Sequence, residues 1–128
     1  MIALIDINIG NLNSVEKALK YLNVEFKVVS DAASLATCSK IIFPGVGNFS
    51  AASNKLAKSH LTAALKREVQ ENNKPFLGIC LGMQLLARKS SEGGVSPGLG
   101  LFDAEVERIP SADGYPVPHI GWNSFGHD

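Results

Sequence analysis

The chain has only two cysteines, Cys38 and Cys80, among its 128 residues, and it carries no excess charge of either sign. Two cysteines cannot build the disulfide framework of a small secreted domain, so we expect a cytoplasmic protein. Lysine and arginine together number 12, as do aspartate and glutamate. This balance argues against a nucleic-acid partner, because such proteins normally carry a basic surplus. No apolar run approaches about 20 residues, so we expect no membrane span.

The sequence also has no cluster of cysteine and histidine residues with the spacing of a metal site. We therefore expect neither a metal ion nor a cofactor. The composition, with 45% hydrophobic and 19% charged residues, is that of an ordinary globular domain. A chain of this length is large enough to bury a single core.

Short apolar runs alternate along the chain with segments of helical periodicity. Four apolar runs predict buried strands: residues 2–7, 25–29, 40–43 and 76–79. Three segments have apolar residues at helical spacing: 13–22, 61–71 and 81–88. This alternation is typical of an α/β fold with a doubly wound parallel sheet, which binds ligands beyond the carboxyl ends of its strands. After Arg88 the sequence is rich in loop residues, and only residues 104–109 predict a further strand.

The most informative stretch is Gly78-Ile-Cys-Leu-Gly82, which lies between a predicted strand and a predicted helix. It is the cysteine form of the G-x-S-x-G nucleophile elbow. In such a turn the nucleophile has a strained backbone, and the residues two before and two after it crowd together, so both are glycine. A helix that starts at the thiol also favours the thiolate. The stretch predicts that Cys80 is a nucleophile, although a buried structural cysteine in a tight turn remains open.

Acyl transfer from a carboxamide also needs an oxyanion hole. In elbow enzymes one donor is the N–H of the residue that follows the nucleophile, here Leu81. The glycine-rich string Pro44-Gly-Val-Gly47 follows the predicted strand 40–43 and is positioned to supply a second donor. A plain turn or a weak phosphate cradle is the alternative, although the string lacks the spacing of dinucleotide and Walker motifs.

Three strings occur in a characteristic order: Pro44-Gly-Val-Gly-Asn-Phe49, Gly78-Ile-Cys-Leu-Gly-Met-Gln84 and Pro118-His-Ile-Gly-Trp-Asn123. With the opening Asp6-x-x-x-Gly10-Asn-Leu-x-Ser-Val-x-Lys-Ala18, they resemble the glutaminase subunits of imidazole glycerol phosphate synthases, which are class I, triad-type glutamine amidotransferases. The resemblance runs over residues 1–125 and implies a flavodoxin-like sheet. It also implies glutamine hydrolysis through a cysteine thioester, with ammonia passed to a (β/α)8 cyclase subunit. That cyclase makes imidazole glycerol phosphate and AICAR in histidine biosynthesis.

The resemblance also implies roles for residues around the elbow. Cys80 would be the nucleophile. Gly45, Val46 and Gly47 would belong to the oxyanion strand, whose peptide is a candidate for a flip on activation. Val46 and Gly47 would then complete the hole with Leu81, and Gly45 would border the substrate.

Other residues would hold glutamine or meet the partner. Gln84 and Glu92 would contact the glutamine head group, although Gln84 could be an exposed helix residue and Glu92 a solvated loop charge. By the same resemblance, Asn11, Trp122 and Asn123 would face the cyclase subunit. Trp122 could instead belong to the core.

One part of the family pattern is absent from these residues. The family's catalytic histidine and glutamate lie in a later His-Pro-Glu segment, and we expect His60, His119 and His127 not to reach Cys80. We therefore expect residues 1–128 to be the N-terminal part of a single amidotransferase domain that lacks its C-terminal strands. Since a triad acts as a unit, we expect little glutaminase activity from this part alone.

Two other functions remain open at this point. A paralogous glutaminase that feeds ammonia to amidino-sugar synthesis for surface polysaccharide would have the same motifs, and only its partner or gene neighbourhood would differ. A non-catalytic binding module could keep the fold without the triad. A downstream in-frame His-Pro-Glu segment would favour the enzyme, and a true stop codon would favour the module.

We expect Cys80 to react with iodoacetamide faster than Cys38, because an elbow holds its thiol above the sheet at the start of a helix. Cys38 lies in a stretch of small residues, and we interpret it as a structural thiol. Mass-mapped labelling at limiting reagent measures both rates in one sample. Preferential labelling of Cys38 would contradict the elbow interpretation.

Overall fold

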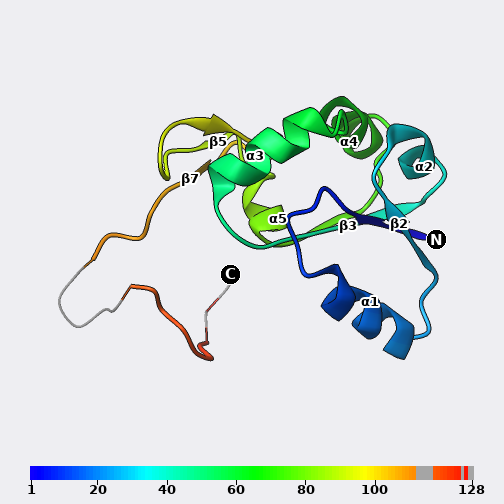
Figure 1. Ribbon diagram of the computed structural model, residues 1–128, viewed down its shortest axis with the longest axis horizontal. Helices are drawn as coiled ribbons and strands as arrows, with labels where there is room; N and C mark the ends of the chain where they lie inside the picture. The colour runs from blue at the N-terminus through cyan, green and yellow to red at the C-terminus, as the bar shows by residue number, and fades with distance from the viewer. Residues whose placement is uncertain (112–116, 125, 127–128) are drawn as a thin grey trace.

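The fold is built on a parallel sheet, seen in the computed structural model, which describes residues 1–111, 117–124 and 126. The strand order is β2-β1-β3-β4, and each neighbouring pair is parallel. The strands are β1 (Ile2–Ile5), β2 (Phe26–Val29), β3 (Lys40–Gly45) and β4 (Phe76–Cys80). Figure 1 shows the sheet at the centre of the molecule. The predicted α/β parallel sheet is confirmed.

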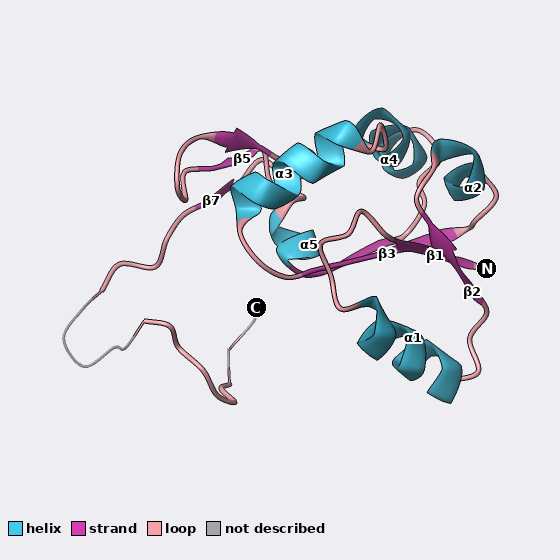
Figure 2. Ribbon diagram, in the orientation of Figure 1, coloured by secondary structure: helices cyan, strands magenta, loops and turns pink. Residues whose placement is uncertain are grey.

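Helices cover both faces of this sheet, as expected for a doubly wound fold (Figure 2). Helix α1 (Leu12–Tyr21) lies on one face. The opposite face is covered by α2 (Ala32–Ala36), α3 (Phe49–Lys58) and α4 (Thr62–Gln70). Among the described residues, no helix has the length and apolar character needed to cross a membrane.

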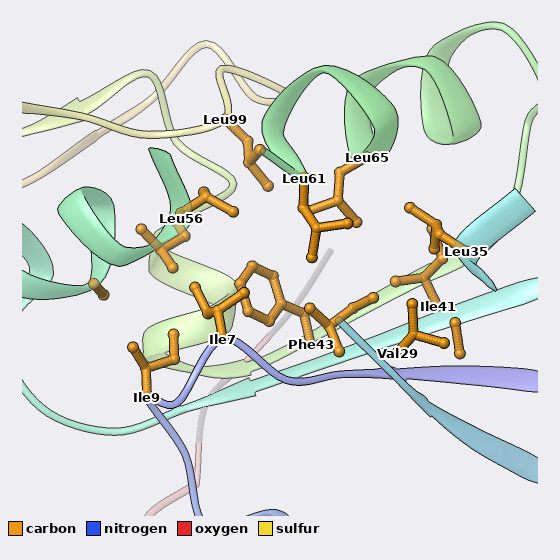
Figure 3. Packing of buried hydrophobic residues seen from close by; sticks show 14 of the residues in the cluster. Ile7, Ile9, Val29, Leu35, Ile41, Phe43, Leu56, Leu61, Leu65 and Leu99 are labelled. Atoms are coloured by element: carbon orange, nitrogen blue, oxygen red, sulfur yellow. The ribbon is translucent and has the colours of Figure 1, made fainter. Parts of the chain in front are cut away.

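The larger core lies between the sheet and helices α2 to α4 (Figure 3). Phe43 of β3 is fully buried there, beside Leu61 and Leu65 at the start of α4. Its ring meets Phe76 of β4 edge-on, with ring centroids 6.2 Å apart. Burial of each such side chain contributes about 1.5–3 kcal/mol, so this layer fixes β3 and β4 relative to the helices. A smaller cluster joins β1 and β3 to α1 through Leu4, Leu19 and Ile42.

β4 is the outer strand of the sheet within the described residues, and it carries Cys80 at its carboxyl end. Its side chains Leu77 and Ile79 are 55% and 38% exposed. Met83, just beyond the strand, is also exposed. The strand is thus held by β3 along one edge and by the core on one face, while its other apolar face is partly bare.

The chain beyond β4 forms a short helix, α5 (Leu81–Gln84), and a small second sheet. In that sheet β5 (Lys89–Ser90) pairs antiparallel with β6 (Ser96–Pro97) and parallel with β7 (Glu105–Val106). The strand predicted over residues 104–109 is therefore present only as its first part, β7.

The helix predicted over residues 81–88 is wrong in extent, because it ends at Gln84. The reason is a returning segment that takes the carbonyls a longer helix would use. The N–H of Leu99 donates to Leu85 O at 2.7 Å, and the N–H of Gly100 donates to Ala87 O at 2.9 Å. Gly98 makes this approach possible, since a Cβ there would lie 2.1 Å from Ala87 O. Competition for backbone acceptors thus stops the helix.

A buried ion pair fixes the chain just before β4. Glu68 of α4, whose side chain is 3% exposed, lies 2.8 Å from Lys74 Nζ and accepts a hydrogen bond from Asn72 at 2.8 Å. Lys74 also donates to the carbonyls of Leu35 and Ala36 at the end of α2. These bonds join the ends of α2 and α4 to the residue that precedes Pro75 and β4, so they position the strand that carries Cys80.

We expect this ion pair to make the protein less stable in acid. The hydrogen bond from Lys74, and then that from Asn72, lower the pKa of Glu68 below its ordinary value of 4.5. A lowered folded-state pKa stabilises the fold above the unfolded-state value, and the contribution disappears as the pH falls through the folded-state value. The Glu68→Gln variant should therefore lose about 1–3 kcal/mol at pH 7 and be less sensitive to acid than the parent.

Urea unfolding followed by circular dichroism at pH 7 and at about pH 3 measures both effects. Glu71→Gln is the matched control, since Glu71 ends the same helix and is exposed. If Glu68→Gln kept the parent's acid sensitivity, the ion pair would not be its source.

Candidate active site

The backbone at Cys80 has the conformation that a nucleophile elbow needs. Cys80 has φ 53° and ψ −115°, a region that side-chain-bearing residues rarely occupy. It is the last residue of β4, it lies opposite Gly45 of β3, and it is exposed. Cys38, by contrast, is buried at 3% exposure. A strained, exposed cysteine at the carboxyl end of β4 is therefore the chemical focus of this sheet.

The two elbow glycines are required by close contacts with their surroundings. A Cβ on Gly78 would lie 2.5 Å from Met83 Cα and 2.9 Å from the carbonyl carbon of Gly82. A Cβ on Gly82 would lie 1.8 Å from the carbonyl oxygen of Phe43 in β3. The crowding that the sequence predicts between the glycines is thus present, and a second contact, between the elbow and β3, adds to it.

The helix after Cys80 is shorter than the sequence predicts, and its dipole is therefore weaker. Helix α5 has four residues, so few peptide dipoles are aligned behind the thiol. A helix dipole grows from aligned peptides, so the positive end of α5 beside Cys80 is weaker than that of the predicted helix. Leu81, the proposed oxyanion donor on this side, is the first residue of α5 and has a buried side chain.

The segment that the sequence analysis assigns to the second oxyanion donor is here called the glycine loop (residues 45–48). It runs directly past the elbow, since a Cβ on Gly45 would lie 3.1 Å from Gly82 N. Gly47 has φ +109°, and nothing lies within 4 Å of the position its Cβ would take. The N–H of Val46 donates to Ile9 O at 2.7 Å. In this conformation the Val46 N–H is occupied, so it serves an oxyanion only after its peptide turns.

Gln84 and Glu92 line one cavity of about 370 Å³, although they are on different elements. Gln84 ends α5, and Glu92 follows β5 with its N–H bonded to Ser90 Oγ at 3.1 Å. The cavity volume is in the range of small-molecule sites. The structure therefore brings together the two residues that the resemblance assigns to the glutamine head group.

His119 also lines this cavity, and sequence reasoning missed that position. In the sequence, His119 belongs to the string Pro118-His-Ile-Gly-Trp-Asn123, which also contains the proposed partner contacts Trp122 and Asn123. It reaches the cavity because residues 117–119 return to residues 106–109, beside Gln84 and Glu92. No periodicity or spacing in the sequence predicts such a return. His60 is exposed between α3 and α4, and His127 lies outside the described residues.

The residues that the resemblance assigns to the partner are exposed. Trp122 is 104% exposed, so the alternative that it belongs to the core does not hold in this structure. Asn123 Oδ1 accepts the N–H of Ser124 at 2.9 Å, and Asn11 precedes α1 without a side-chain capping bond. Among the described residues, no hydrogen bond joins Asn11 to Trp122 or Asn123, so the structure does not by itself bring them into one patch.

Comparisons with known proteins agree with this architecture. A parallel sheet that presents an elbow cysteine beside a glycine loop is an arrangement suited to nucleophilic catalysis by cysteine. The sequence matches glutamine amidotransferase class-I over residues 3–125, so the chain belongs to the class I glutamine amidotransferase family. A crystal structure of a glutamine amidotransferase superposes with a TM-score of 0.72 at 25% identity, covering 84% of this chain and 57% of that one.

Two curated relatives are each named imidazole glycerol phosphate synthase subunit HisH. The one from Caldanaerobacter subterraneus subsp. tengcongensis is 48% identical over 125 residues, which are 98% of this chain and 60% of that protein. The one from Prochlorococcus marinus is 44% identical over 127 residues, or 99% of this chain and 59% of that protein. The chain thus spans about three fifths of the length of these relatives.

We expect Gly82→Ala to destabilise the protein by about 3 kcal/mol or more, because the new methyl group would meet a backbone carbonyl of β3. That carbonyl belongs to a strand paired on both sides, so it cannot move without breaking sheet hydrogen bonds. The matched control is Gly126→Ala, where nothing lies within 4 Å. Thermal and urea unfolding measure the difference, and equal stability of the two variants would show that the elbow does not press on β3.

Proposed function

We propose that this protein hydrolyses glutamine to glutamate and ammonia, with Cys80 as the nucleophile. The thiolate attacks the carboxamide carbon, the C–N bond breaks to release ammonia, and a glutamyl thioester forms on Sγ. Water then cleaves the thioester and regenerates the thiol. The observation that carries the proposal is the exposed, strained Cys80 opposite Gly45, in a chain of the class I glutamine amidotransferase family.

The oxyanion of the tetrahedral intermediate would be held by the N–H groups of Leu81 and of the glycine loop, from Val46 and Gly47. Since the Val46 N–H is bonded to Ile9 O, we propose that its peptide turns before or during catalysis. Val46 lies between two glycines, Gly45 and Gly47, and Gly47 has positive φ and open space around it, so the backbone next to the turning peptide can adjust.

Glutamine would bind between the elbow and the cavity that Gln84 and Glu92 line. The carboxylate of Glu92 suits the α-ammonium group of glutamine, and the amide of Gln84 suits its α-carboxylate. Gly45 would border the reacting carboxamide, since it pairs with Cys80 on the neighbouring strand.

Ammonia would pass to a (β/α)8 cyclase subunit that makes imidazole glycerol phosphate and AICAR in histidine biosynthesis. The names of the two curated relatives support this pathway over the surface-polysaccharide alternative. Asn11, Trp122 and Asn123 would contact the cyclase. Full exposure of Trp122 supports this role, because tryptophan is enriched at the energetic centres of interfaces. We place this heterodimer in the cytoplasm, and both described cysteines are free thiols.

Two steps of the reaction need a positioned acid–base group: protonation of the leaving ammonia and activation of the hydrolytic water. Such a group contributes about 10²–10⁴-fold to the rate. The resemblance assigns it to a histidine and a glutamate beyond the matched positions. We therefore propose residues 1–128 as the N-terminal part of one amidotransferase domain, and the activity as a property of a protein that includes that pair.

Glutamate release by the complete protein with its cyclase subunit tests the proposal. Cys80→Ala should lower the rate by roughly 10³-fold or more, because no other group can form the thioester. Cys38→Ala is the control and should stay near the parent rate. After an acid quench, the parent should carry one glutamyl group on the peptide that contains Cys80. If Cys80→Ala kept its activity, or the adduct mapped elsewhere, the proposal would be wrong.

A further inference from the structure

Two hydrogen bonds tie the glycine loop and α3 to the β1–α1 loop (residues 6–11). Lys55 of α3 donates from Nζ to the carbonyl oxygen of Asn8. The next carbonyl along the chain, that of Ile9, accepts the N–H of Val46. Because α3 begins at Phe49, directly after the glycine loop, the chain from Val46 to Lys55 and these two bonds close a ring.

The β1–α1 loop is a firm support within this ring. Asn8 has φ 59°, and its N–H donates to Asp6 Oδ1 at 2.8 Å. The side chain of Ile9 is buried in the main core, where Ile7 and Ile9 point toward Leu56 of α3 (Figure 3). Side-chain burial and local hydrogen bonding therefore hold the loop against α3. The hydrogen bond from Lys55 of α3 to Asn8 adds a further contact between the helix and this loop.

The ring borders a cavity of about 310 Å³ whose lining includes Asn8, Val46, Gly47 and Lys55. The Val46 N–H belongs to the peptide that joins Gly45 to Val46. Val46 and Gly47 both line the cavity, and nothing lies within 4 Å of the position a Gly47 Cβ would take, so the chain beside this peptide borders open space. The contact that holds this peptide in its present orientation is the bond from the Val46 N–H to Ile9 O. An interaction that fixes the position of the Ile9 carbonyl therefore also stabilises the present conformation of the glycine loop.

We infer that Lys55 is a positioning residue that keeps the glycine loop in its resting conformation. Its ammonium group holds the Asn8 carbonyl, and this fixes the adjoining peptide so that the Ile9 carbonyl stays in place as the acceptor of the Val46 N–H. In this role Lys55 acts on the oxyanion hole through the backbone, without touching Cys80. The inference rests on the proposed function, since only in a glutaminase does the orientation of Val46 set a rate.

Lys58 provides a matched comparison on the same helix. It lies one turn beyond Lys55 and borders a neighbouring cavity that Asp6, Asn8 and Lys55 also line. In the described part of the chain, no hydrogen bond joins Lys58 to the β1–α1 loop. Removal of either lysine changes the local charge equally, but only removal of Lys55 deletes a bond to Asn8.

Hydrogen exchange of the Val46 amide tests the inference without any catalysis. In Lys55→Met, protection of this amide should fall about tenfold, the effect of one lost hydrogen bond on the ring. Lys55→Arg, which keeps a charged donor, and Lys58→Met should leave the protection near that of the parent. Amides of Leu4 and Ile42 in the sheet should be unchanged in all variants. Unchanged protection of Val46 in Lys55→Met, or an equal fall throughout the sheet, would overturn the inference.

Acylation of Cys80 by an activated γ-nitrophenyl ester of glutamate tests the functional consequence. Nitrophenolate leaves without a proton, so the measurement does not depend on an acid–base partner. Lys55→Met should be acylated several-fold faster than the parent, whereas its alkylation by iodoacetamide, which forms no oxyanion, should be unchanged. Lys55→Arg should restore the parent rate.

The two proposals fail in different ways. If the ester acylated no variant at Cys80 while the Val46 amide lost protection in Lys55→Met, the role of Lys55 in holding the glycine loop would be supported and the proposed function would be wrong. If the parent were acylated at Cys80 but Lys55→Met were neither faster in acylation nor less protected at Val46, the proposed function would stand and the role of Lys55 would be wrong.

Discussion

The site depends on the contact between the elbow and β3. Gly82 lies so close to the Phe43 carbonyl that no side chain fits between them, and Phe43 is in turn fixed by the largest buried cluster. The conformation of Cys80 is therefore set by the core and not by the turn alone. Because interiors are close-packed and resist deformation, the strain at Cys80 persists only while β3 and the helices above it stay in place.

The same strand, β3, also positions the other half of the site. Its carboxyl end continues into the glycine loop, while its neighbour β4 ends at Cys80, so parallel pairing delivers both segments to one edge of the sheet. The β1–α1 loop comes from a third parallel strand and supplies the acceptor for the Val46 N–H. The positions of the proposed nucleophile, of the proposed oxyanion donors and of the loop that holds those donors thus follow from strand order, as in other doubly wound sheets.

Sequence reasoning succeeded where the determinant is local. Gly78, Cys80 and Gly82 are within one turn, and the apolar runs of β1, β3 and β4 carry their own periodicity. It failed where the determinant is a partner far along the chain. The early end of α5 depends on a segment more than ten residues later, and the position of His119 depends on a return to β7.

The bonds of Lys74 to α2 and of Lys55 to the β1–α1 loop were equally invisible to sequence reasoning. Both are single lysines that reach backbone carbonyls far away in sequence, 38 residues for Lys74 to Ala36 and 47 residues for Lys55 to Asn8, and such contacts leave no periodic pattern. The resemblance to a known family proposed site residues without indicating which of them share a cavity. That information comes only from the tertiary structure.

The outer edge of β4 has a consequence for handling residues 1–128 on their own. Along this strand the described chain offers unpaired backbone groups flanked by Leu77 and Ile79, which is the kind of template onto which another extended segment adds. Such addition is bimolecular, so its extent rises with protein concentration. Any strand that adds there lies alongside Cys80, the last residue of β4. For residues 1–128 on their own, self-association and the access of reagents to this thiol are therefore coupled.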